Sequence, residues 1–456
     1  MTLDVHREPL EHLAAFAVGL TWDTMPQNVR RRAQLALLDT LGTILGGATT
    51  RAARTAARAA VAHGGHSPII GSPGTSSTPF AAFATAVSAS ALDFDDGHYL
   101  GGAIHPGSVI ISSLLTAAAQ PDQGGDVGMA ELLAAQVVGY EISLRAAHLL
   151  WPRHDTADYH CTGTAATLGA AAAVTKLRGG DADEIARSIA IAWAHAPMAT
   201  FQLPMVKESI GWSAASACFA ADLAAAGFMA GRVTADADTV AILPPTPFHR
   251  DGAMDDPFVA SLGTVFEALN TYSKPYAACR YTHTAAGALA TTMAENALTG
   301  DDIISIDVHT HRSALFLHDQ RPPTLEHGQY SFPFVLSAIV CEGAAGQVEI
   351  SEEALADPQR LAEAAKVRVH HQPELDGLYP HHYAARVVVR TKDGDTIDVT
   401  RIVAPGDNDD PMSAEDLDAK FIALATPSLG GDASQLAQDL VGSELTDLHG
   451  VFALLT

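Results

Sequence analysis

Residues 92–106, Leu-Asp-Phe-Asp-Asp-Gly-His-Tyr-Leu-Gly-Gly-Ala-Ile-His-Pro, concentrate acids and bases in one short segment. The segment holds three carboxylates and two imidazoles, on Asp93, Asp95, Asp96, His98 and His105. It follows an almost uncharged run, residues 78–91, whose composition predicts a buried helix. Acidic and basic groups gathered at the end of an apolar helix indicate a reaction site.

The spacing within this segment predicts how its side chains meet. If the helix continues, Asp93 and Asp96 share one face at i, i+3. The three glycines of the segment then let the backbone turn sharply and bring His105 back. We therefore expect these carboxylates and the imidazole in one pocket. Asp95 would point in another direction, and we expect it to accept hydrogen bonds from backbone N–H groups.

Composition excludes several classes of partner. The 456 residues are 48% hydrophobic, which is enough for a sizeable core and two or three domains. A net charge of −25 argues against nucleic acid and anionic membrane surfaces, although local cations can still bind a small anion. The four cysteines show no CxxC spacing, and no signal peptide or membrane-spanning run is visible. We therefore expect a cytoplasmic protein with free thiols.

The pattern along the chain predicts a mainly helical fold with a mixed α/β insertion. Residues 8–62 predict two helices separated by a turn at Pro26, and residues 130–230 are helical in character and rich in alanine. The character changes near residue 269. Residues 303–309 alternate as a strand does, and residues 385–403 predict a hairpin that turns at Asp393-Gly394. The last 45 residues return to helix, starting near Ser413.

Cationic side chains occur in three further segments. His160 and Thr162 precede an alanine-rich helix, whose unpaired N–H groups can bind a carboxylate. Lys207 follows a proline-containing turn, and Lys274 stands near Arg280 and His283, so two of only six lysines lie in motif-like segments. The alternative for Lys274 and Arg280 is an ordinary surface ion pair. Gathered cations in so acidic a chain favour a substrate with two or three carboxylates.

Other chemistries have weaker support. A divalent metal at the aspartate and histidine cluster is less favoured than acid/base work, because the spacing matches no metal-binding loop. Cys161 beside His160 and Cys279 near His283 fit small buried residues better than nucleophiles. No phosphate loop, GxSxG elbow or dinucleotide fingerprint occurs.

Leu-Asp-Phe-Asp-Asp followed by His-Pro-Gly-Ser resembles a signature of the MmgE/PrpD family, which contains 2-methylcitrate dehydratases, cis-aconitate decarboxylases and iminodisuccinate epimerases. Similar pieces follow the family order along nearly the whole chain. They are the region around Asp39, His160 with Thr162, Lys207, the block from Lys274 to His283, and Tyr330-Ser331-Phe332. For Asp39 itself we prefer a pairing role within the helix bundle.

The resemblance implies a fold and an assembly. It implies a large all-helical domain built from both chain ends, 1–268 and 402–456, and an α/β lid domain at 269–401. The active site would lie between them, in a homodimer that needs no metal and no organic cofactor.

The resemblance also implies roles for individual residues. The catalytic candidates are Asp93, His105, His160 and Lys207. The substrate-binding candidates are Asp96, His98, Thr162, Lys274, Arg280 and His283. The shared chemistry is proton transfer at a carbon next to a carboxylate, with lysines stabilising the developing enolate.

We predict a cofactor-independent lyase, a dehydratase of a 2-methylcitrate-like hydroxy-polycarboxylate. Gly97, Phe334 and Cys161 depart from residues frequent in the family (Thr, Tyr in the decarboxylases, and Pro), which weakens cis-aconitate decarboxylation in particular. The alternatives are a dicarboxylate epimerase, a decarboxylase, and a non-catalytic carboxylate-binding or assembly protein.

Overall fold

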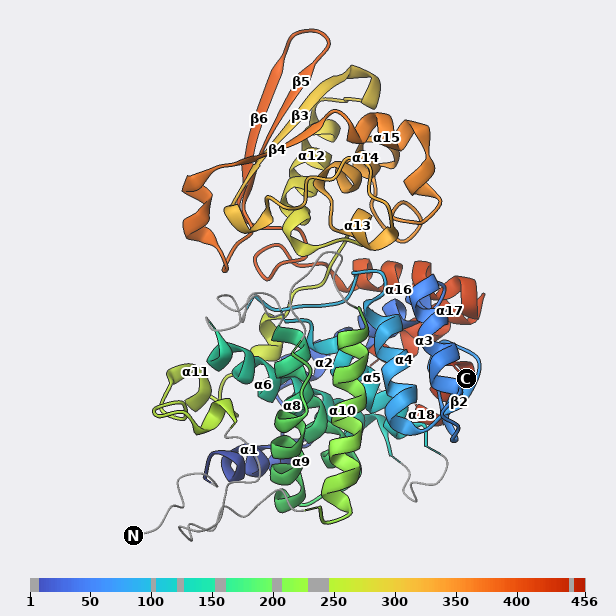
Figure 1. The fold of residues 1–456 in the computed structure, drawn as a ribbon, viewed down its shortest axis with the longest axis vertical. Helices are drawn as coiled ribbons and strands as arrows, with labels where there is room; N and C mark the ends of the chain where they lie inside the picture. The colour runs from blue at the N-terminus through green and yellow to red at the C-terminus, as the bar shows by residue number, and fades with distance from the viewer. Residues whose placement is uncertain are drawn as a thin grey trace.

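The computed structural model describes residues 8–99, 104–120, 127–151, 161–198, 207–228, 246–442 and 447–455. The fold is mainly helical with a smaller mixed α/β part, as predicted (Figure 1). The helices before residue 269 are α1 (Glu8–Gly19), α2 (Gln27–Gly47), α3 (Arg51–Val61), α4 (Thr78–Ser90), α5 (Pro106–Ala118), α6 (Met129–Leu150), α8 (Cys161–Leu177), α9 (Ala182–Ala194), α10 (Lys207–Ala225) and α11 (Pro257–Ala260). A two-stranded sheet, β1 (Ser67–Pro68) with β2 (Thr75–Ser76), connects α3 to α4.

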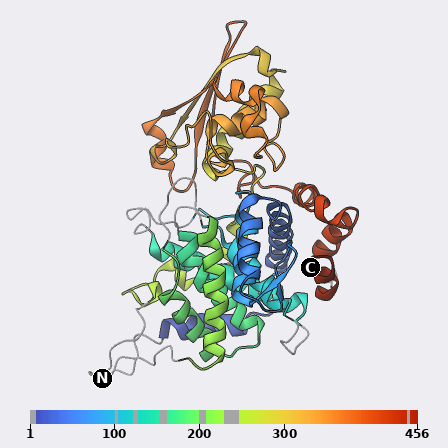
Figure 2. The same cartoon turned by 45° about the vertical axis from the view of Figure 1, so that its right-hand side comes forward.

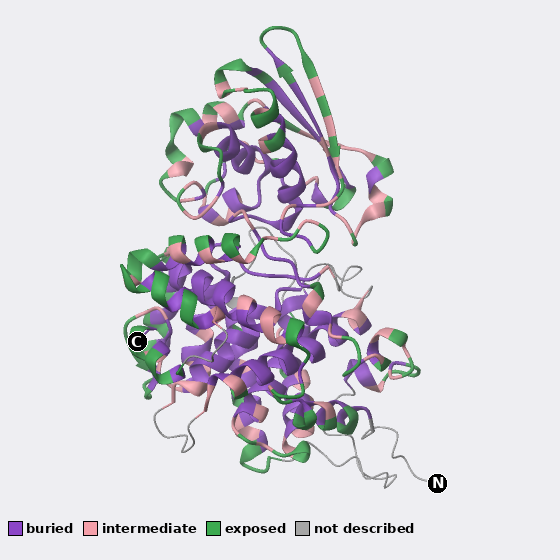
Figure 3. Cartoon of the chain, turned by 180° about the vertical axis from the view of Figure 1, so that it is seen from behind, coloured by how far each residue is buried: buried purple, intermediate pink, exposed green. Residues whose placement is uncertain are grey.

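Small side chains let the central helices approach closely. α8 is buried along almost its whole length and packs against α5, α6, α9 and α10. Buried residues fill the middle of the helical part (Figure 3). A Cβ atom on Gly169 would lie 2.1 Å from the backbone oxygen of Gly139, so these glycines set the spacing of α8 and α6. Glycine and alanine therefore allow the close helix contacts that the alanine-rich sequence predicts.

The end of the chain completes the helical part. α16 (Ala414–Leu429), α17 (Asp432–Val441) and α18 (Leu448–Leu455) follow the mixed part, and α16 packs on α2 (Figure 2). Ser413 starts α16 with a capping box to Asp416, as predicted. The helical part is therefore built from both ends of the chain.

The α/β part contains one four-stranded sheet. Its strands are β3 (Ile303–Thr310), β4 (Val367–His371), β5 (Ala385–Thr391) and β6 (Thr396–Arg401), in the order β4-β3-β5-β6. β3 and β4 are parallel, whereas β5 and β6 form the predicted antiparallel hairpin. Gly394 has a φ of +93° in its turn, a conformation that glycine adopts without strain. The helices of this part are α12 (His283–Glu295), α13 (Leu325–Gln329), α14 (Phe332–Glu342) and α15 (Pro358–Ala364); α12 packs on β5 and β6, and α14 on β4.

One element differs from the sequence prediction. Residues 8–62 form three helices rather than two, because Thr50 accepts a hydrogen bond from Ala53 N–H and starts α3. The boundaries at 268/269 and 401/402 stay predictions. Within the described ranges, no helix combines the length and apolar character that crossing a bilayer requires.

Candidate functional site

The loop after α4 carries its aspartates inward. α4 ends at Ser90, and residues 91–99 are not helical. Asp93 has a φ of +50°, the left-handed region that non-glycine residues rarely adopt. The expectation that Asp93 and Asp96 share a helical face is therefore wrong, because the backbone turns at Asp93. Both carboxylates, and that of Asp95, are nonetheless buried.

Lys274 is fixed against Asp93. Its ammonium Nζ donates to the backbone oxygen and to Oδ1 of Asp93, both at 2.9 Å, and lies 3.8 Å from Oδ1 of Asp95. Burial opposes the charge on Lys274, but the Asp93 and Asp95 carboxylates outweigh it and raise the pKa above its ordinary value. Lys274 is therefore an ammonium ion held beside two carboxylates.

Asp95 lies between Lys274 and His105. Its Oδ2 is 3.8 Å from Nδ1 of His105 and accepts a hydrogen bond from the Ser108 hydroxyl, while Oδ1 faces Lys274. The sequence predicts backbone N–H partners for Asp95 and no role for it in the site. The turn at Asp93 places it instead among the side chains that we did select.

His105 precedes α5 and has a defined tautomer. Its Nδ1 is 2.7 Å from the backbone oxygen of Asp96. Because a carbonyl oxygen only accepts, Nδ1 carries the hydrogen and Nε2 carries the lone pair. Burial lowers the pKa of His105 below its ordinary value, although Asp95 opposes this shift. A buried, neutral imidazole of fixed tautomer can act as a general base.

Asp96 holds the loop against α5. Its Oδ1 accepts from Gly107 N–H at 3.0 Å, and its Oδ2 accepts from the Tyr140 hydroxyl at 2.6 Å. Burial raises the pKa of Asp96 to about 7. Since both carboxylate oxygens have protein partners, the geometry favours a positioning role over the substrate contact that the resemblance implies.

His98 and Thr162 also fix the loop. The N–H of His98 donates to Ile104 O at 2.8 Å and its carbonyl accepts from Ile104 N–H at 3.0 Å, which returns the chain to His105 as predicted. His98 Nε2 lies 3.7 Å from Oε2 of Glu267. Thr162, in the first turn of α8, accepts from His105 N–H at 3.0 Å. The start of α8 therefore contacts the candidate base directly.

The side chains of two catalytic candidates lie outside the described residues. His160 lies outside the described residues, immediately before α8. Lys207 is the first residue of α10, and its side chain also lies outside the described set.

Arg280 and His283 bind each other in the interior. His283 Nε2 lies 3.0 Å from Ala278 O and therefore carries the hydrogen, so Nδ1 can accept from Arg280 at 3.2 Å. Burial, with the charges of Arg280 and Lys274, lowers the pKa of His283 well below its ordinary value. The guanidinium also donates to Pro405 O at 2.7 Å. Both side chains thus have protein partners in this conformation.

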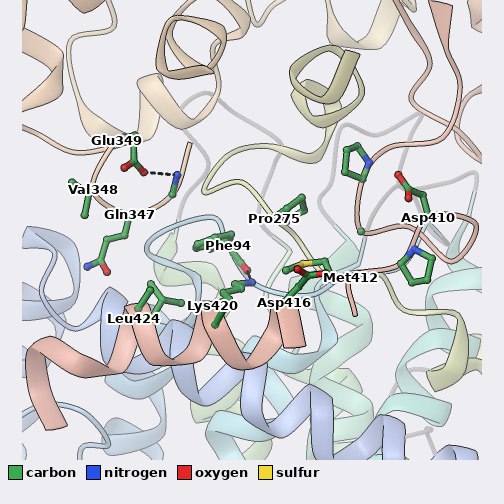
Figure 4. Close-up of a pocket in the computed structure, with 16 residues that line it drawn as sticks. Phe94, Pro275, Gln347, Val348, Glu349, Asp410, Met412, Asp416, Lys420 and Leu424 are labelled. Carbon is green, nitrogen blue, oxygen red and sulfur yellow. Dashed lines mark hydrogen bonds between the residues drawn. The ribbon is translucent and has the colours of Figure 1, made fainter. Parts of the chain in front are cut away.

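Lys420 of α16 supports the same segments from the opposite side. Its Nζ lies 2.6 Å from Oδ1 of Asp39 and donates to Phe94 O at 2.7 Å and to Lys274 O at 3.0 Å. The Asp39 pairing role that we preferred is thus visible, whereas sequence reasoning missed Lys420. Lys420 and Phe94 line a cavity of about 560 Å³ between α16 and residues 346–349, in which Lys420 points at Phe94 (Figure 4).

Two family models match most of the chain. Residues 11–239 match the model of the MmgE/PrpD N-terminal domain, and residues 276–443 match that of the MmgE/PrpD C-terminal domain. The chain belongs to the MmgE/PrpD family. Its relatives include the cis-aconitate decarboxylases of Homo sapiens, 26% identical over 98% of this chain and 93% of the relative, and of Mus musculus, 26% identical over 96% and 91%.

Phe334, one of the departures from the MmgE/PrpD pattern, has a packing role. Phe334 packs beneath the Arg360 guanidinium, 4.7 Å from the ring centroid, in the core of the α/β part. Tyr330 is also buried, and burial together with the Asp93 carboxylate raises its pKa well above the ordinary value. Tyr330 carries the phenolic hydroxyl that Phe334 lacks.

The Cys161 thiol of this MmgE/PrpD chain is a poor nucleophile. Cys161 is fully buried, and burial raises its pKa to about 12. Among the described residues, no group of three or more His, Cys, Asp or Glu side chains is arranged to hold a metal ion.

Proposed function

We propose that this protein is a cofactor-independent lyase that dehydrates a 2-methylcitrate-like hydroxy-polycarboxylate. The observation that carries the proposal is His105, a buried neutral imidazole whose Nδ1–H is fixed on Asp96 O. Its Nε2 lone pair can accept the proton from a carbon next to a carboxylate. Elimination forms the alkene as the C–H proton passes to His105 and the C–O bond breaks. The leaving hydroxide takes up a proton from solvent and departs as water, and His105 then returns its proton to solvent.

Lys274 supplies the positive charge that this step requires. The electron pair left by the proton develops negative charge on the adjacent carboxylate, and a buried ammonium stabilises that charge strongly. Asp93 holds Lys274 in place through two hydrogen bonds. In this proposal His160 and Lys207 assist proton transfer, and His98 and Thr162 bind substrate. Asp96, Arg280 and His283 position these groups.

Decarboxylation of cis-aconitate is the second candidate, because the two relatives carry that activity in their names and cover nearly the whole chain. Loss of carbon dioxide needs charge stabilisation and a proton donor, but no base in its first step. A neutral His105 beside Lys274 therefore favours dehydration or the related epimerisation. A decarboxylase would need a proton donor, and the buried Tyr330 hydroxyl is a candidate for that role.

Proton NMR in deuterated water distinguishes these reactions with one substrate panel: 2-methylcitrate, citrate, cis-aconitate and iminodisuccinate. Dehydration gives an alkene signal from a hydroxy acid, which is the result we expect. Loss of one carboxylate from cis-aconitate would show the decarboxylase, and inversion with deuterium uptake but no alkene would show the epimerase. A chain that converts none of the four would contradict the proposal.

A further inference from the structure

Tyr272 lies against the candidate catalytic loop. Its backbone pairs with Gly97 through N–H to O bonds of 2.8 and 3.1 Å, so the two residues are directly opposite. The tyrosine ring lies below the Arg280 guanidinium, 4.3 Å from its centre, and 5.2 Å from the Tyr99 ring. These contacts hold the ring rigidly in the interior, where only 1% of Tyr272 is exposed.

These packing contacts involve the ring of Tyr272 and not its hydroxyl. It is buried, and it forms no hydrogen bond with any residue that the structure describes. A buried polar group without a partner destabilises a fold. An aromatic ring can cover a glycine in a paired strand, but phenylalanine would do so without burying a hydroxyl. Packing explains why the ring is buried, but it does not explain why a hydroxyl is buried with it.

The hydroxyl occupies the space beside the loop that a side chain at position 97 would fill. A Cβ atom on Gly97 would lie 2.3 Å from the Tyr272 oxygen and 2.4 Å from the ring carbon that carries it. Burial raises the pKa of this phenol well above its ordinary value, with smaller contributions in the same direction from Tyr99, Asp95 and Asp93, so it stays protonated. Tyr272 therefore presents an O–H donor, near the catalytic aspartates, from a segment outside the loop.

We propose that Tyr272 is a substrate-binding residue whose O–H donates a hydrogen bond to one carboxylate of the polycarboxylate substrate. The inference rests on the proposed function for the class of substrate. A carboxylate oxygen is a strong acceptor for a buried phenol and satisfies the hydroxyl only when substrate is bound. Such a bond selects substrates that carry a carboxylate at one particular carbon.

Binding of inert analogues to the full chain tests this role. Isothermal titration calorimetry would compare wild type, Tyr272→Phe and Tyr281→Phe with tricarballylate and with two analogues that lack one carboxylate, glutarate and 2-methylsuccinate. Tyr281→Phe is the matched control. Its ring is linked to that of Tyr272 through contacts with Tyr383 and Tyr99, but its hydroxyl has a protein partner, that of Tyr379, at 3.3 Å. Thermal unfolding of each variant monitors the fold.

We expect Tyr272→Phe to bind tricarballylate about tenfold more weakly at an unchanged or higher melting temperature. The tenfold loss should persist with one dicarboxylate and vanish with the one that lacks the contacted carboxylate. Tyr281→Phe should bind as wild type does. If Tyr272→Phe bound all three ligands with wild-type affinity, or lost affinity equally for all three, this inference would be overturned. The proposed function would not be affected by that result. A wild-type protein that binds none of them would overturn the polycarboxylate proposal and this inference with it.

Discussion

At the scale of single residues, the site is built from charges removed from water. Asp93 and Lys274 compensate each other, and His105 stays neutral beside Asp95. Such burial is costly unless each charge has a partner, which explains why side chains far apart in sequence converge here. A pair of this kind keeps Lys274 charged and fixed in direction before any substrate binds.

Asp96 gives a prediction about pH at this scale. Burial raises its pKa from 3.8 to about 7, so between these values the folded state binds a proton that the unfolded state does not. The resulting stability is fully present below pH 3.8 and is lost as pH rises through about 7, at roughly 1.4 kcal/mol per pH unit. Asp96→Asn keeps the side-chain size and does not titrate. The stability of Asp96→Asn relative to wild type, measured by urea unfolding, should therefore increase from pH 5 to pH 8; a constant difference would contradict this account.

Sequence reasoning found some of these residues and missed others for identifiable reasons. Asp93 and His105 stand out through the density of ionisable groups around them. Asp95 was misjudged because the i, i+3 argument assumes a helix, and the left-handed turn at Asp93 has no signal in the sequence. Lys420 lies 326 residues from the loop carbonyl that it contacts and belongs to no motif.

At the scale of elements, helices and hairpins were predictable because each follows a local pattern. The alternation of residues 385–401 and the turn at Gly394 specify β5 and β6 without help from the rest of the chain. The parallel pairing of β3 with β4 joins strands separated by more than fifty residues, and no local sequence pattern predicts this pairing. The contact of α16 with α2 is of the same long-range kind.

Lys420 gives a prediction about that helix contact. Its ammonium and the Asp39 carboxylate are both buried, at 2.6 Å. Lys420→Met leaves the carboxylate buried without its cation, which should lower the unfolding free energy by about 3–5 kcal/mol. Adding Asp39→Asn should recover part of the loss.

The matched control is Lys366→Met, which removes a partly exposed lysine paired with Glu363 and should cost less than about 1 kcal/mol. Urea unfolding measures all of these variants. If Lys420→Met were no more destabilising than Lys366→Met, the buried pair would not hold α16 on α2.

At the scale of the whole molecule, a strongly acidic chain keeps cations at the site. The net charge is −25, yet Lys274, Arg280 and Lys420 are all buried near the 92–106 loop. Cations gathered beside this loop suit a small anionic substrate at short range, even though the chain as a whole is acidic. The dimer and the cytoplasmic location stay predictions.

The most direct test of the central claim is the rate at which the α C–H proton of the accepted substrate exchanges with deuterated water, compared between wild type and His105→Gln. The account predicts at least a hundredfold slower exchange in His105→Gln, with tricarballylate binding and melting temperature preserved, because the base is lost and the carboxylate contacts are not. Exchange at the wild-type rate would contradict the assignment of His105 as the base.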